Sequence, residues 1–211
     1  MNEPKTIDGD SGSSLESATA HLAELAGSKQ LVLLGDQVGV SQHVRFVADS
    51  LPELYAAGVT NLAWEFTNDR SQKQLDDLLS AELWEESRCI ELFVDLLGIG
   101  FTYREYADVL RAAWSLNRSL PTDADSFRVI GLGLPTYVED PELLDGRSAT
   151  ELELRNWWMG GHYRDVAAFH MANILTTEVL RSGQRAVVLL SAERTTTRLI
   201  QWVDGVPNVS V

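Results

Sequence analysis

The sequence predicts a three-layer α/β fold, in which a mostly parallel central sheet is covered by helices on both faces. Four short runs are apolar almost throughout, and stretches with helical periodicity lie between them. A strand without a polar face is typical of a parallel sheet that is buried between two layers of helices. The four predicted strands are 30–35, 60–66, 127–133 and 185–191.

Each intervening stretch carries apolar residues at spacings of three and four, the pattern of an amphipathic helix. The first two such stretches stop at Gly27 and Gly58, and glycine is a common helix terminator. The first helix between two strands therefore completes a β-α-β unit with a right-handed crossover. The tail is expected to supply a hairpin or edge strands about Asp204 and Gly205. The predicted helices are 15–26, 43–57, 71–79, 83–97, 103–117, 149–158 and 163–181.

Length and composition predict one domain. The 211 residues are 45% hydrophobic, enough for one sizeable core, and no internal repeat or interdomain linker is visible. Residues 1–12 are rich in Gly, Ser and Asp and are expected to be a disordered leader, so that the α/β domain spans 13–211. No apolar run reaches the length of about 20 residues that a membrane helix needs, so no membrane association is expected. The N-terminus lacks a secretion pattern, and a cytoplasmic location is therefore predicted.

Charge and residue counts argue against several function classes. The formal charge of −14 disfavours a nucleic-acid partner, because phosphate binding needs a basic face. A single cysteine, Cys89, rules out an internal disulfide, and the four histidines form no HxxxH or HExxH pattern, so no metal and no cofactor are expected. There is no GxSxG elbow and no P-loop. The expected partner is a small-molecule substrate, and a homodimer stays possible.

Candidate catalytic residues follow from the predicted topology. In parallel α/β sheets, ligands bind beyond the carboxyl ends of the strands. Asp36 follows the first predicted strand, Glu65 lies within the second, and Glu193 and Arg194 follow the fourth, so these residues are expected to converge. Glu65 stands in an apolar strand, where burial raises a carboxylate's pKa towards the range useful for acid/base work. The alternative is that Glu65 only caps a neighbouring helix.

Further candidates carry alternatives of their own. Asp36 is either functional or the N-cap of the next helix. Arg164, at the start of the last long helix, pairs with Glu65, holds a substrate anion or forms a surface ion pair. His43, near the start of the second helix, is a further catalytic candidate. Aromatic residues near the expected pocket either line it for a bulky apolar ligand or pack in the core: Tyr103, Tyr106, Trp114, Trp157, Trp158 and Tyr163.

The order of five segments resembles a known group of proteins. The chain resembles the erythromycin esterase-like and ChaN-like group, the haem-uptake/Tiki superfamily, over about residues 30–199. Each motif is loose by itself, and the order and spacing of the segments carry the resemblance. The segments are LVLLGDQVGVSQHVRFV, NLAWEFTNDRSQKQLDDLL, FTYREYADVLRAAWSLNRSLPTDADSFRVIGL, YRDVAAFHMANIL and RAVVLLSAERTTTRL.

The chain departs from this group at its histidines. The resemblance implies Gly-Glu-x-x-His after the first strand, but the sequence at 35–39 is GDQVG, so Gly39 replaces the histidine. After the last strand, Glu193 and Arg194 stand where the group carries one or two histidines. The expected strand glutamate and helix-start arginine are present as Glu65 and Arg164. The resemblance therefore implies the scaffold without the histidine-activated water and without haem ligation.

Three functions follow as hypotheses. The first is an enzyme of secondary metabolism that performs cyclisation, elimination or isomerisation on a bulky apolar substrate. Glu65 would be its acid/base, and the two arginines, Arg164 and Arg194, would stabilise negative charge. Asp36 and Glu193 would orient these groups. The second hypothesis is a non-catalytic member that binds a ligand or partner, and the third is an esterase-like hydrolase with His43 as a relocated base.

Overall fold

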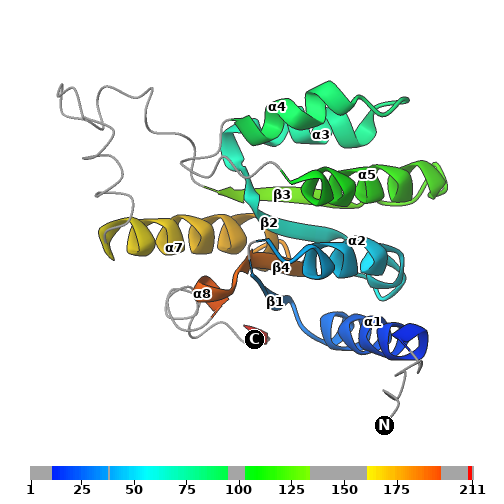
Figure 1. The fold of residues 1–211 in the computed structure, drawn as a ribbon, viewed down its shortest axis with the longest axis horizontal. Coiled ribbons are helices and arrows are strands. Elements are labelled where there is room, and N and C mark those ends of the chain that lie inside the picture. The colour runs from blue at the N-terminus through cyan, green and yellow to red at the C-terminus, as the bar shows by residue number, and fades with distance from the viewer. Residues whose placement is uncertain (1–10, 38, 95–102, 134–160, 196–208, 211) are drawn as a thin grey trace, which may run out of the picture.

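The computed structural model describes residues 11–37, 39–94, 103–133, 161–195 and 209–210, and its centre is one parallel sheet. Every strand pair in it is parallel, and the order is β3-β2-β4-β1-β5 (Figure 1). The predicted α/β fold is confirmed. The strands are β1 (Leu31–Asp36), β2 (Asn61–Asn68), β3 (Arg128–Gly133), β4 (Ala186–Ser191) and β5 (Val209–Ser210).

The helices follow the predicted periodic stretches, with differences at their ends. The first begins at Ser11, so it includes the last two residues of the predicted leader. The last long helix ends in a π-helical turn, η3 (Thr176–Leu180), and the predicted helix 149–158 lies outside the described residues. No helix of the described ranges is long and apolar enough to cross a bilayer. The helices are α1 (Ser11–Ser28), α2 (Ser41–Ala56), α3 (Gln72–Ser80), α4 (Glu86–Val94), α5 (Arg104–Ser119), α7 (Gly161–Leu175) and α8 (Ala192–Thr195), with a 3₁₀ turn, η1 (Asp69–Ser71).

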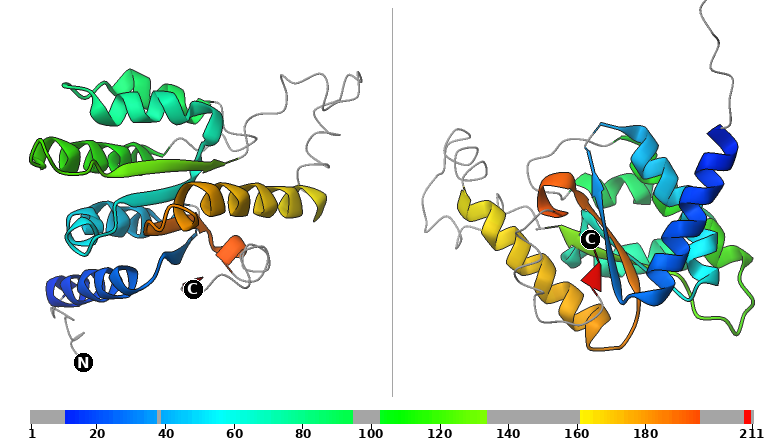
Figure 2. Two further views of the ribbon diagram at one scale, coloured as in Figure 1. Left: turned by 180° about the vertical axis from the view of Figure 1, so that it is seen from behind. Right: turned by 90° about the horizontal axis from the view of Figure 1, so that it is seen from below.

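Strand order explains why helices cover both faces. From β1 to β2 and on to β3 the chain moves towards one edge of the sheet, whereas from β3 to β4 it moves back. Right-handed crossovers place connections of opposite direction on opposite faces. Accordingly, α1 to α5 pack on one face and α7 packs on the other (Figure 2).

Successive residues of a strand contribute side chains to two separate hydrophobic cores, because side chains alternate between the faces of a sheet. The core under α1 to α5 contains Val32, Trp64 and Leu189, whereas the core under α7 contains Leu33 and Ala63. This alternation explains why the strands appear apolar throughout in the sequence.

Side-chain amides close the free edge of β3. Asn117 donates from Nδ2 to the Phe127 carbonyl (2.9 Å) and accepts from the Phe127 N–H (2.7 Å). Gln72 donates from Nε2 to the Val129 carbonyl (2.9 Å) and accepts from the Gly131 N–H (2.9 Å). Each amide thus makes the two hydrogen bonds that a neighbouring strand would make, which protects an edge from pairing with another chain.

Candidate active site

The carboxyl ends of three neighbouring strands form the candidate site. Strand β4 is reached from α7 on one face, and it lies between β1 and β2, which lead to helices on the other face. Open α/β sheets bind ligands where the connections of neighbouring strands lie on opposite faces of the sheet. Asp36, the last residue of β1, is in register with Ser191, the last residue of β4.

Glu65 connects the ends of β2 and β4. Its side chain is buried, and Oε2 accepts a 2.7 Å hydrogen bond from the backbone N–H of Ser191. A buried backbone N–H needs an acceptor, and a carboxylate is a strong one. One function of Glu65 is therefore to hold the end of β4 beside β2.

Asp36 is almost fully buried, with 1% of its surface exposed. Its Oδ2 accepts a long, 3.5 Å hydrogen bond from the Tyr106 hydroxyl, and its Oδ1 lies 3.4 Å from Nδ1 of His43. Burial raises the pKa of the Asp36 carboxyl above its usual value, and the charge of Glu65 adds to this, while His43 and Tyr106 lower it. Asp36 does not cap α2, because the N-cap of that helix is Val40, without a side-chain cap bond.

His43 lies in the first turn of α2 and faces the end of β1. Its side chain is 44% exposed, and Nδ1 accepts a 3.2 Å hydrogen bond from the N–H of Gln37. His43 thus has a buried carboxylate beside one ring nitrogen and a ring that solvent can reach. In this arrangement an aspartate orients a histidine for proton transfer.

An aromatic cluster supports Asp36 from the side of α5. The Tyr106 ring stacks on Phe66 (centroids 4.6 Å apart) and meets Trp64 and Tyr103 edge to face at 5.5 and 5.6 Å. Burial, together with the neighbouring charge of Asp36, raises the pKa of the Tyr106 hydroxyl above its usual value. The hydroxyl is therefore a hydrogen-bond donor throughout the neutral pH range.

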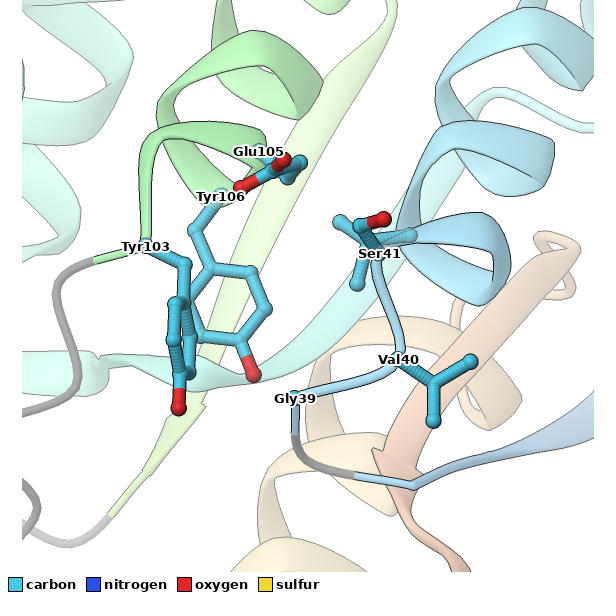
Figure 3. Close-up of a pocket in the computed structure, with 7 residues that line it drawn as sticks. Gly39, Val40, Ser41, Tyr103, Glu105 and Tyr106 are labelled. Atoms are coloured by element: carbon cyan, nitrogen blue, oxygen red, sulfur yellow. The ribbon is translucent and has the colours of Figure 1, made fainter.

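A hollow of about 240 Å³ opens beside this cluster. Figure 3 shows the two tyrosine rings side by side, with the Tyr106 hydroxyl on the side of Gly39. Gly39 has a φ of 90°, in the region that favours glycine over residues with a side chain. The lining residues are Gly39, Val40, Ser41, Val44, Tyr103, Glu105 and Tyr106.

Trp114 does not line this hollow. It lies eight residues after Tyr106 on α5, about 12 Å at 1.5 Å per residue. There it packs against Trp84 (centroids 5.9 Å apart) and donates from Nε1 to the Ala81 carbonyl at 2.8 Å. The structure therefore shows a packing contact for Trp114, and its substrate-binding role stays a prediction, because periodicity indicates which face of a helix is buried but not which end meets the site.

The remaining candidates are only partly described. Arg164 and Tyr163 lie in the first turns of α7, and Glu193 and Arg194 lie in α8 directly after β4, but their side chains are outside the described part of the structure. The same holds for the whole of Trp157 and Trp158. The sequence indicated Tyr106 only as one of several aromatic residues near the site, and its hydroxyl hydrogen-bonds to Asp36. Within the described ranges, no three His, Cys, Asp or Glu residues are close enough to hold a metal ion.

Comparison with known proteins identifies the fold only. No protein-family model matches the chain, and no curated protein matches it. Among solved structures, the type III effector HopBA1 is similar at 17% identity and a TM-score of 0.55, covering 90% of this chain and 77% of that one. A structure described as "Bacterial protein toxins" has 15% identity and a TM-score of 0.48, covering 88% of this chain and 34% of that one. The likeness to the HopBA1 structure shows the fold alone.

Proposed function

We propose that this chain is an enzyme that acts on a small molecule by proton transfer, with His43 as acid/base and Asp36 as the residue that orients it. The observation that carries the proposal is the 3.4 Å contact between Nδ1 of the half-exposed His43 and Oδ1 of the buried Asp36. An isolated surface histidine has no such partner. A buried carboxylate against one ring nitrogen fixes the ring and stabilises the imidazolium that forms when the other nitrogen takes a proton.

Glu65 has a different role in this proposal from the one that the sequence indicated. Its Oε2 is engaged by the Ser191 N–H at 2.7 Å, and its side chain is buried. Glu65 therefore fits a positioning residue, which fixes the end of β4 and places negative charge near Asp36. Arg164 and Arg194 stay proposed partners for a substrate's negative charge.

The reaction class that we propose first is proton abstraction from carbon, as in isomerisation, elimination or cyclisation. The hollow beside Tyr106 is about 240 Å³, smaller than the pockets of roughly 300–1,000 Å³ that hold drug-sized ligands. It suits a small substrate, or one end of a larger one. A carbonyl group next to the reacting carbon makes its hydrogen acidic enough for a histidine base.

Deuterium exchange tests this reaction without a known substrate. The protein is incubated in deuterium oxide with a panel of small ketones, aldehydes and hydroxy acids, and proton NMR follows the loss of the signal next to the carbonyl. For any compound that exchanges, His43→Gln should lower the rate by about 10²-fold or more. The matched control is His21→Gln, which changes an exposed histidine on α1. Equal losses in both variants, or none in His43→Gln, contradict the proposal.

Hydrolysis is the second candidate, and the exposure of His43 favours it. With 44% of its side chain accessible, the ring can be reached by water as well as by a substrate. His43 would take a proton from water as the oxygen attacks an ester carbonyl, and the alcohol would leave. A panel of p-nitrophenyl esters and lactones tests it, with the same two histidine variants. If neither panel responds above the blank, a non-catalytic ligand-binding chain is the better hypothesis.

A further inference from the structure

Two groups compete for one nitrogen of His43. Nδ1 accepts the Gln37 N–H at 3.2 Å, and it also lies 3.4 Å from Oδ1 of Asp36. Oδ1 is buried and has no hydrogen-bond partner among the described residues. In a neutral imidazole, Nδ1 either accepts or donates. The two contacts are therefore alternatives: Nδ1 accepts from Gln37, or Nδ1–H donates to Asp36.

The choice between these contacts decides whether His43 is a base. When Nδ1–H donates to Asp36, Nε2 carries the free electron pair and can take a proton. When Nδ1 accepts from Gln37, Nε2 carries the hydrogen and can only donate. An ionised Asp36 favours the first state, because its Oδ1 then needs a donor, whereas a protonated Asp36 removes that preference.

Tyr106 acts on the charge of Asp36. Its hydroxyl lies 3.5 Å from Oδ2, on the oxygen that His43 does not face. The stacked and edge-to-face contacts with Phe66 and Trp64 hold the ring in place. A donor to a carboxylate favours the ionised form, whereas the neighbouring charge of Glu65 opposes it. Within the described part of the chain, His43, Tyr106 and Glu65 are thus the titratable groups that act on the pKa of Asp36.

We propose that Tyr106 is a positioning residue: by donating to Asp36, it holds His43 in the tautomer whose Nε2 is free to accept a proton. The use of this base rests on the proposed function, but the tautomer itself does not. Tyr106 also lines the hollow, with its hydroxyl on the side of Gly39 (Figure 3). A ligand oxygen in the hollow, from a carbonyl, carboxylate or phosphate group, would compete with Asp36 for the same hydrogen. At 3.5 Å the existing bond is long enough to be redirected easily.

Nitrogen NMR of the labelled histidine rings tests the proposal without any substrate. Long-range proton–nitrogen spectra distinguish the Nδ1–H tautomer from the Nε2–H tautomer of neutral His43. Tyr106→Phe keeps the ring and its packing but removes the donor, so the ratio of Nδ1–H to Nε2–H should fall by about threefold, the effect of one weak hydrogen bond. Asp36→Asn should shift the ratio in the same direction, and the double variant should add little to it.

Tyr55→Phe is the matched control. It also removes one hydroxyl and its hydrogen bond, 2.7 Å to the Asp125 carbonyl, but at the far end of α2. The proposal fails if Tyr106→Phe leaves the His43 tautomer unchanged or if Tyr55→Phe shifts it equally. Should Tyr106→Phe not fold, an unchanged tautomer in Asp36→Asn refutes the proposal by itself. If the His43 tautomer responds to Tyr106→Phe but the protein turns over no compound of either panel, the proposed function is refuted. The coupling from Tyr106 through Asp36 to His43 then still holds.

Discussion

Asp36 at the end of β1 and Glu65 in β2 are buried carboxyl groups, whereas Arg128 at the free edge of β3 is exposed and paired. Asp36 is 1% exposed and its Oδ1 has no hydrogen-bond partner among the described residues. By contrast, Arg128 on β3 is 37% exposed and meets Glu178 at 2.9 Å and Asp76 at 3.6 Å.

The two regions also differ in the side chains that hydrogen-bond to their backbone groups. Gln72 satisfies the edge of β3 with a neutral amide, whereas Glu65 satisfies Ser191 with a buried carboxylate. A neutral amide suffices to make a hydrogen bond, and burying a charge costs free energy. The edge of β3 is therefore arranged for stability, whereas the strand ends hold buried carboxyl groups that stability does not require.

The largest expected effect is the loss of the Glu65 carboxylate. Glu65→Ala removes the acceptor of the Ser191 N–H and leaves a part-buried donor without a partner. The free energy of unfolding should fall by about 2 kcal/mol, within the 1–3 kcal/mol that an unsatisfied buried group costs. Urea denaturation followed by circular dichroism measures it.

Glu65→Gln is the control for this change, because it keeps an oxygen acceptor of the same reach. It should cost less than half as much as Glu65→Ala. Equal losses in the two variants would mean that the charge of Glu65, and not its hydrogen bond, holds the end of β4.

Asp36→Asn should change stability less, and in the opposite direction. Burial raises the pKa of Asp36, so the folded protein binds this proton more tightly than the unfolded chain does. Its contribution to stability is therefore fully present below the unfolded pKa of about 4 and is lost as the pH rises through the folded pKa. Asparagine cannot ionise, so at pH 7 the variant should be more stable than the unchanged protein.

The measurement for Asp36→Asn is the melting temperature of both proteins from pH 4 to pH 8. The difference between them should grow with pH and then level off above the folded pKa of Asp36. A difference that is constant across this range would show that Asp36 has the same pKa in the folded and unfolded chain. Lost activity with gained stability is the trade-off expected of a functional residue.

The order of apolar and polar residues along the chain was enough to predict the α/β fold and the position of Asp36 beside the end of β4. The four long strands have buried side chains on both faces, and they are therefore continuous apolar runs in the sequence. Topology then places the carboxyl ends of these strands together.

The partners of Asp36 could not be predicted in the same way. Tyr106 is 70 residues away in the chain, and the contact depends on how α5 enters beside β2. A tyrosine that packs in a core and one that also donates to a carboxylate have the same local pattern. The positive φ of Gly39 likewise could not be predicted, because it depends on the path of the chain between β1 and α2.

The smallest expected effect is the loss of the Arg128 charge on the β3 edge. Both of its partners are exposed, Glu178 at 40% and Asp76 at 44%, so water already screens the pairs. Arg128→Met keeps much of the aliphatic stem and removes only the guanidinium. Because exposed ion pairs contribute about 0–1 kcal/mol, we expect the free energy of unfolding to fall by no more than about 0.5 kcal/mol, and by less in 1 M salt. Urea denaturation at low and high salt measures it beside Glu65→Ala. A loss as large as that of Glu65→Ala would mean that the β3 edge depends on its charges as strongly as the strand ends depend on Glu65, and the contrast between the two regions would be wrong.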